Sequence, residues 1–187
     1  MEYVEPIKET SKINEIKKKL EDKSDRDLLL FVLGINTGIR VCDLLKLKVE
    51  DVWAEGNPKE FLFIIEEKSS ERKAYYLNTK VKSAIRNFLQ SRELELDDYL
   101  FRSKKQNLPI TRQQAYRIIN NAAKEVGIAG NIGTHTLRKT FGYHAYRKGI
   151  AISLLKSIYN HSTSSETLRY IGIEKNEEHY IKIDVNL

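Results

Sequence analysis

The sequence predicts one domain of the α+β class, mainly helical with a small antiparallel β-hairpin. Most of its 187 residues fall in segments with apolar side chains every three or four positions, the spacing of amphipathic helices. Capping signals precede several of these segments. One pair of neighbouring segments, 61–65 and 74–77, has strand-like composition with a polar connection between them, which predicts the hairpin.

Charge and cysteine content narrow the class of function. Thirty-two Lys and Arg against 26 Asp and Glu give a net charge of +6, which favours a polyanionic partner. The alternative is a soluble basic surface without a nucleic-acid role. Cys42 is the single cysteine, which excludes an internal disulfide and suits a reducing compartment. The sequence has no apolar run long enough to cross a bilayer.

The N-terminal half is expected to begin with a lead-in segment, residues 1–9. Thr10 or Ser11 is expected to cap the first helix. Ser24 begins a motif similar to a capping box, which predicts the start of a second, buried helix. Gly38 is expected to end this helix. A short amphipathic segment follows, and residues 55–58 form a turn before the hairpin.

The C-terminal half is expected to be helical. Its capping signals are Asn78, the box Thr111–Gln114, Thr134, and Ser164 or Ser165. The helices are expected after Asn78, from Thr111 to Gly127, from Thr134 to about Lys148, over 152–159 and in the turn that carries Tyr170.

Residues 133–170 concentrate chemically useful side chains: His135 and Arg138 three positions apart, then His161, then Tyr170 nine residues later. A phenol has a pKa of about 10, so it needs a base or positive surroundings to act as a nucleophile. Taken singly, a capping histidine, a solvated arginine and a structural histidine are ordinary features. Taken together, they suit attack by the Tyr170 oxygen on a phosphodiester.

Two further cations are candidates. Arg40 follows a Thr-Gly-Ile segment at a helix start, where its guanidinium could fork two hydrogen bonds onto phosphate oxygens. The alternative is a surface arginine paired with Asp43. Lys68 lies at the hairpin tip, where it could reach into a groove or simply be solvated.

No metal or cofactor is expected. The four histidines show no ligand spacing typical of zinc, and no carboxylate cluster suits two magnesium ions. Phosphoryl transfer by this chain would therefore be metal-free.

The order of these pieces resembles the catalytic domain of the tyrosine recombinases, the phage-integrase family. The resemblance runs from about Pro6 to Ile173. Residues 37–47 (Thr-Gly-Ile-Arg-Val-Cys-Asp-Leu-Leu-Lys-Leu) are similar to the first family box and residues 135–138 (His-Thr-Leu-Arg) to the second. Residues 149–162 resemble the stretch that ends in the third-box histidine, here His161, and Tyr170 matches the nucleophile.

Three departures from the family pattern stand out. Tyr159-Asn160 replaces the usual Leu-Gly, although asparagine tolerates the left-handed backbone that glycine provides. Asp43 stands where glutamate is commoner. The separate helical domain that precedes most catalytic domains is not in this sequence, so the chain is either a single-domain member or an excised fragment.

The resemblance implies the tyrosine recombinase catalytic-domain fold and a role for each candidate. The catalytic residues would be Arg40, Lys68, His135, Arg138, His161 and the nucleophile Tyr170, with Asp43 in support and no cofactor. Lys68 matches the family's hairpin lysine better than Lys73 does. The reaction would be site-specific DNA cleavage and rejoining through a 3′-phosphotyrosyl intermediate.

The implied partner is double-stranded DNA, bound by a homotetramer whose subunits are monomers when free. Residues 10–173 would form the catalytic domain, and residues 174–187 would dock on a neighbouring subunit. The setting would be cytoplasmic, prokaryotic or phage-encoded, as for mobile elements. By charge and position, Lys104, Lys105, Arg112 and Arg117 are candidates for contacting bases.

Three other functions remain open: a type IB topoisomerase-like relaxer, a non-cutting DNA-binding regulator of the same fold, and a basic interaction module without a DNA role. The His-x-x-Arg pair and the compact length favour the recombinase over the relaxer. The full set of catalytic residue types argues against the regulator.

Overall fold

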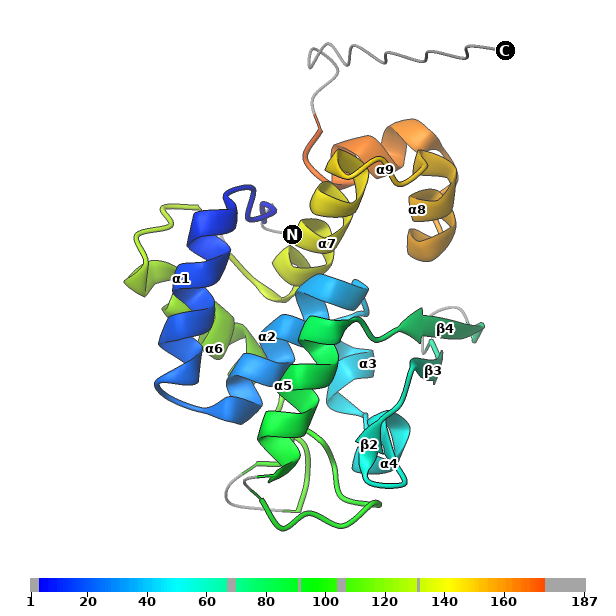
Figure 1. The fold of residues 1–187 in the computed structure, drawn as a ribbon. Helices are drawn as coiled ribbons and strands as arrows, with labels where there is room; N and C mark the ends of the chain where they lie inside the picture. The colour runs from blue at the N-terminus through cyan, green and yellow to red at the C-terminus, as the bar shows by residue number, and fades with distance from the viewer. Residues whose placement is uncertain (1–3, 67–69, 91, 104–106, 131, 174–187) are drawn as a thin grey trace, which may run out of the picture.

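The computed structural model describes residues 4–66, 70–90, 92–103, 107–130 and 132–173. It confirms the predicted class: within these residues the chain is mostly helical and carries two small antiparallel sheets of two strands each (Figure 1). No helix of the described part is long and apolar enough to cross a membrane.

The main core surrounds α2, residues Asp25–Thr37. Nearly every side chain of its central run is buried, because α2 packs against helices on several sides (Figure 1). The other helices of this body are α1 (Thr10–Glu21), α3 (Val41–Leu45), α4 (Val49–Val52), α5 (Thr79–Gln90) and α6 (Arg112–Glu125).

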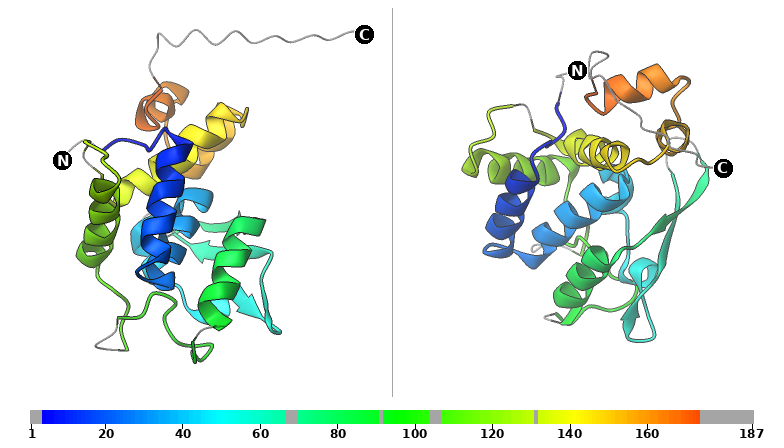
Figure 2. Two further views of the ribbon diagram at one scale, coloured as in Figure 1. Left: turned by 60° about the vertical axis from the view of Figure 1, so that its left-hand side comes forward. Right: turned by 45° about the horizontal axis from the view of Figure 1, so that its top comes forward.

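A smaller apolar cluster joins the last three helices, α7 (Thr134–Arg147), α8 (Ile152–Tyr159) and α9 (Ser164–Tyr170). Leu155, Tyr159 and Ile171 are buried at its centre. Helix α7 links the two clusters, because Leu137 near its start lies in the main core. Figure 1 and the right-hand view of Figure 2 place α7 between α2 and the pair α8 and α9.

The hairpin forms as expected, from β3 (Phe61–Ile65) and β4 (Arg72–Tyr76), with Phe61 opposite Tyr76 and Ile65 opposite Arg72. The expected second strand was 74–77, so its start is displaced by two residues. Side chains of β3 alternate between the buried and the exposed face, which is the period of a half-buried strand. A second small sheet pairs β1 (Trp53–Ala54) with β2 (Asn57–Pro58) around the predicted turn.

Several local predictions are confirmed. The Ser24 hydroxyl accepts a hydrogen bond from the Asp27 amide at 3.4 Å. Gly38 ends α2 with a φ of 67°, a left-handed conformation that favours glycine. Thr111 and Gln114 form the reciprocal capping box, at 3.2 and 2.8 Å.

Three predicted caps are wrong by one or two residues. Helix α1 begins at Thr10 itself, after Glu9. Helix α7 begins at Thr134 after Gly133, whose amide donates to the Thr136 hydroxyl at 3.1 Å. At α9 the hydroxyl of Thr163, rather than a serine, accepts from the Glu166 amide at 3.1 Å. At α9, three adjacent hydroxyl residues, 163–165, could each serve as the cap, so sequence alone does not select one. At α1 and α7 the capping position falls on Glu9 and Gly133, and the expected hydroxyl residue is instead the first residue of the helix.

The described part of the lead-in segment, residues 4–9, lies beside α7 (Figure 2). The amide of Ile7 donates to the Thr140 hydroxyl at 2.9 Å, and its carbonyl lies 2.9 Å from Nε2 of His144. The ammonium of Lys139 donates to the Val4 carbonyl at 2.7 Å. These contacts fix residues 4–7 beside the helix that carries the His-x-x-Arg pair.

We expect Gly142→Ala to loosen α8 and α9 from α7. A Cβ atom at position 142 would lie 2.1 Å from the Tyr159 hydroxyl and 2.6 Å from Cγ2 of Ile171. Overpacking of this kind costs about 1–3 kcal/mol, more than alanine gains in helix propensity. Chemical denaturation would measure the loss. Gly34→Ala is the comparison: its Cβ would meet Leu137 instead, so the strain should fall on the contact of α2 with α7 and leave α8 and α9 in place.

Candidate active site

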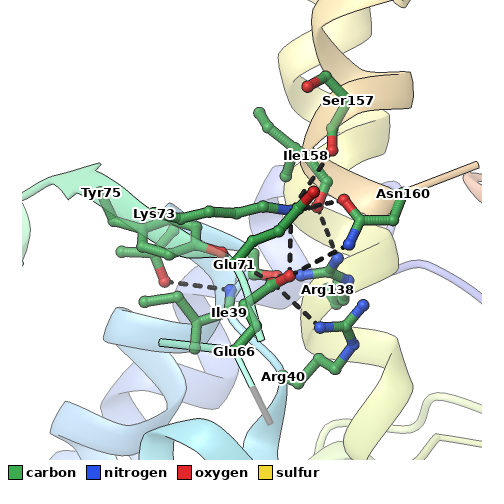
Figure 3. Close-up of polar contacts among 12 residues, drawn as sticks. Ile39, Arg40, Glu66, Glu71, Lys73, Tyr75, Arg138, Ser157, Ile158 and Asn160 are labelled. Carbon is green, nitrogen blue, oxygen red and sulfur yellow. Dashed lines mark hydrogen bonds and ion pairs between the residues drawn. The ribbon is translucent and has the colours of Figure 1, made fainter. Parts of the chain in front are cut away.

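The site lies where the end of α2, the loop end of the hairpin, α7 and the end of α8 meet (Figure 3). Arg40 directly precedes α3 in extended backbone, just after the left-handed turn at Gly38. Arg138 comes from the first half of α7. Two arginines that are 98 positions apart in sequence thus lie together in this site.

Arg138 is almost fully buried, with 4% of its surface exposed. Its Nη1 donates to the Gly38 carbonyl and its Nη2 to the Ile158 carbonyl, the latter at 2.9 Å. Its guanidinium carbon lies 4.6 Å from the centre of the Tyr159 ring, within range of a cation–π interaction. These contacts hold the guanidinium in one orientation and join α2 to α8.

Glu66, which follows β3, is an acidic residue of the site that the sequence analysis did not single out. Its carboxylate is 1% exposed. Oε1 lies 3.0 Å from Nη1 of Arg40 and accepts from the Tyr75 hydroxyl at 3.0 Å. Burial and the Glu66 carboxylate both raise the pKa of Tyr75, so its phenol remains a donor. Pairing with Asp43 was the alternative reading of Arg40; Asp43 is buried in α3, and Arg40 forms an ion pair with Glu66.

Lys73 on β4 bridges the hairpin to the end of α8. Its ammonium lies 3.0 Å from Oε2 of Glu66 and 2.6 Å from Oδ1 of Asn160 (Figure 3). It also donates to the Ile158 carbonyl at 3.3 Å. Asn160 adopts the left-handed backbone expected of it, with φ 57° and ψ 44°. Lys68, the predicted hairpin lysine, lies outside the described residues, so its placement stays a prediction.

Tyr170, at the end of α9, lies among aromatic rings. Its ring centre is 5.0 Å from that of His161 and 5.1 Å from that of Tyr159. The Lys139 ammonium lies 5.2 Å from the Tyr170 ring centre. The ring of His161 is oriented by a hydrogen bond, because its Nδ1 lies 3.1 Å from the hydroxyl of the buried Thr167.

The electrostatics of Tyr170 combine two opposing effects. Burial raises the pKa of its phenol above the ordinary value, and the charges of Arg138 and Arg40 lower it by a smaller amount. The arginines therefore act on this phenol, as the sequence suggested, but without DNA their effect does not outweigh burial. The phenol is protonated at neutral pH, so attack on a phosphate requires a group that accepts its proton.

Burial and neighbouring cations keep the His135 imidazole neutral, the form in which a ring nitrogen is free of a second proton. Burial lowers the pKa of its imidazole, and the nearby charges of Arg112, Lys139, Arg138 and Arg40 lower it further. The ring is therefore neutral at pH 7. Its Nε2 lies 3.5 Å from Nη2 of Arg112, one of the four cations considered for base contacts. Of the other three, Arg117 is exposed on α6, and Lys104 and Lys105 lie outside the described residues.

The signal that could have revealed Glu66 is the strand alternation. Leu62, Ile64 and Glu66 share one parity, and the first two are core residues. A glutamate in phase with buried positions indicates a buried charge that must have partners. Among the described residues, no three His, Cys, Asp or Glu side chains gather as a metal site.

Relatives by sequence are recombinases and integrases. Residues 7–177 match the sequence model of the phage integrase family. YoeC of Bacillus subtilis (strain 168), a probable integrase/recombinase, is 41% identical over 175 residues, which cover 94% of this chain and 93% of YoeC. A tyrosine recombinase of Pseudothermotoga lettingae is 32% identical over 167 residues, which cover 88% of this chain and 56% of that protein. The chain thus spans nearly all of the first relative and about half of the second.

Solved structures share the fold. The crystal structure of XerA recombinase has a TM-score of 0.74 at 20% identity, covering 93% of this chain and 61% of that one. XerH site-specific recombinase, in a post-cleavage complex with its palindromic difH substrate, has a TM-score of 0.71 at 19% identity, covering 89% of this chain and 49% of that one. At these identities the likeness establishes the common architecture.

Proposed function

The chain belongs to the phage integrase family, and we propose that it is a site-specific recombinase that cleaves DNA with Tyr170 and rejoins it. The expected family and the expected tyrosine recombinase fold are confirmed. So is the expected enzyme class, strand breaking and rejoining by a tyrosine. The roles of individual residues and the mode of assembly are our proposals.

The observation that carries the assignment of the nucleophile is the convergence of two arginines on one partly buried phenol. Arg40 and Arg138 come from distant parts of the chain, and both act electrostatically on Tyr170. A phosphate placed between these cations and the phenol would receive charge-assisted hydrogen bonds and lie within reach of the Tyr170 oxygen. The net charge of +6 favours the DNA that carries this phosphate.

In the proposed reaction the Tyr170 oxygen forms a bond to phosphorus while the bond from phosphorus to the 5′-oxygen breaks. The products are a 3′-phosphotyrosyl link and a 5′-hydroxyl. A second 5′-hydroxyl then reverses the step, so rejoining needs no nucleotide cofactor, because the energy of the phosphodiester is kept in the covalent link.

Arg40 and Arg138 would stabilise the charge on the non-bridging oxygens, at about 3–4 kcal/mol per preorganised donor. Neutral His135 would take the phenol proton, and Lys68 would protonate the leaving 5′-oxygen. His161, oriented by Thr167, would hydrogen-bond the phosphate. Buried Asp43 would support the turn that carries Arg40.

A nicked suicide substrate tests this proposal. DNA from the protein's own genetic neighbourhood, nicked beside the cleavage position, loses a short fragment after attack and so traps the covalent complex. We expect a slow band on a denaturing gel, and a peptide in which the DNA is attached to Tyr170. DNA that is bound but never cleaved would contradict the proposal. Relaxation of supercoiled DNA without joining of two sites would indicate the topoisomerase-like alternative.

We further propose that the chain, a monomer when free, assembles as a homotetramer on DNA and that residues 174–187 dock on a neighbouring subunit. Ile173, the last described residue, lines a cleft of about 1090 Å³ between the lead-in segment and α9. A chain ending at Ile173 should then bind DNA but fail to form the tetrameric complex in native gels. Assembly equal to that of the full chain would rule out the docking role.

A further inference from the structure

We infer that Glu66 is a positioning residue for DNA cleavage: its buried carboxylate holds Arg40 and Lys73 in place beside the phosphate site. The inference rests on the proposed function and extends it to a residue outside the predicted catalytic set. It follows from the contacts of the carboxylate, from its burial and from its place in the hairpin.

Among the described residues, each oxygen of the Glu66 carboxylate meets a cation and a neutral donor. Oε1 pairs with Arg40 and accepts from the Tyr75 hydroxyl, both at 3.0 Å. Oε2 pairs with Lys73 at 3.0 Å and accepts from the Asn160 amide at 3.4 Å. A carboxylate that is 1% exposed stays ionised only when it is compensated in this way.

The contact to Arg40 is one-sided. Nη1 faces Glu66, whereas the other terminal nitrogen points away from it (Figure 3). Glu66 thus holds the guanidinium by an ion pair to one nitrogen and leaves the remaining donors for a substrate. Long side chains such as arginine lose considerable conformational entropy when they are ordered, and holding Arg40 in advance removes that cost from the cleavage step.

Glu66 also anchors the hairpin loop. Its amide donates to the Glu71 carbonyl at 2.9 Å, and its carbonyl accepts from the Ser70 amide at 2.8 Å. In sequence, Lys68 lies between these anchored positions. Glu66, which orients Arg40, therefore also fixes the two ends of the loop to which Lys68, the proposed general acid, belongs.

A different role for the same carboxylate makes the opposite prediction. If Glu66 were an internal anion that occupies the place of the phosphate, removing its charge would speed up cleavage or tighten DNA binding. Glu66 is buried, and it accepts a hydrogen bond from the hydroxyl of the buried Tyr75. Both features favour a permanent supporting role over that of an anion which DNA displaces.

The test compares Glu66→Gln with Glu71→Gln in full-length protein. Glutamine keeps the size of the side chain but not the charge. Glu71 is a matched control, because its 60% exposed carboxylate lies 3.5 Å from the same Lys73 and such surface pairs contribute little. We expect Glu66→Gln to cleave a saturating suicide substrate about 10- to 100-fold more slowly. DNA affinity should stay within about threefold of wild type, and Glu71→Gln should behave as wild type.

A double-mutant cycle with Arg40→Lys separates positioning from general loss of structure. If Glu66 acts through Arg40, the double variant should be much less impaired than the product of the two single losses. Multiplicative losses, equal cleavage by wild type and Glu66→Gln, or faster cleavage by Glu66→Gln would each overturn the inference while the proposed function stands. If wild type itself cleaves no DNA that it binds, the proposed function fails, and the inference fails with it.

Discussion

Replacing Tyr170 by phenylalanine is expected to abolish the covalent protein–DNA complex while DNA binding persists. The variant lacks only the attacking oxygen, and its ring keeps the stacking contacts with His161 and Tyr159. Loss of a nucleophile from an active site that works as a unit commonly lowers the rate by about 10³-fold or more. The measurement is the yield of trapped complex on the nicked substrate, together with DNA affinity by fluorescence anisotropy.

Tyr143→Phe is the matched control, because Tyr143 belongs to α7 and packs its ring against His144. Its trapped complex should form at the wild-type rate. A persistent complex in Tyr170→Phe would show that another side chain attacks the phosphate. The peptide attached to the DNA would then identify that side chain directly.

Replacing Arg138 is expected to have the second largest effect, because this side chain serves the fold and the site together. Arg138→Met leaves the carbonyls of Gly38 and Ile158 without their charged donor. Hydrogen bonds to a charged group contribute about 1.5–3 kcal/mol each, so the variant should be destabilised by several kcal/mol, which makes it unsuitable for kinetics. Chemical denaturation would measure that loss.

Arg138→Lys is the variant for kinetics. It keeps the positive charge but cannot reach both carbonyls and a phosphate with one ammonium. We expect the cleavage rate on saturating substrate to fall about 10²- to 10³-fold, with a smaller loss of stability than in Arg138→Met. Arg86→Lys on α5 is the control and should be nearly neutral. If Arg138→Lys cleaved at the wild-type rate, the phosphate-binding role of Arg138 would be wrong.

The local architecture could be predicted because its causes are local. Caps at Ser24 and Thr111, the left-handed turns at Gly38 and Asn160, and the alternation of β3 depend on residues within a few positions of each other. The predicted helices and the hairpin follow from these signals. At α9 the error arose because adjacent hydroxyl residues could each serve as the cap. At α1 and α7 the helix begins one residue earlier than expected, after Glu9 and Gly133, neither of which caps it with a side chain.

The sequence by itself also determined the family and the order of the candidate site residues, because the spacing of Arg40, His135, Arg138, His161 and Tyr170 is a property of the chain. Only the tertiary structure decided that Arg40 pairs with Glu66 and that Lys73 ties the hairpin to α8. It also decided that burial of Tyr170 outweighs the arginines. Ion pairing and burial depend on which segments, distant in sequence, come into contact. The packing of α2, the hairpin, α7 and α8 decides which segments these are.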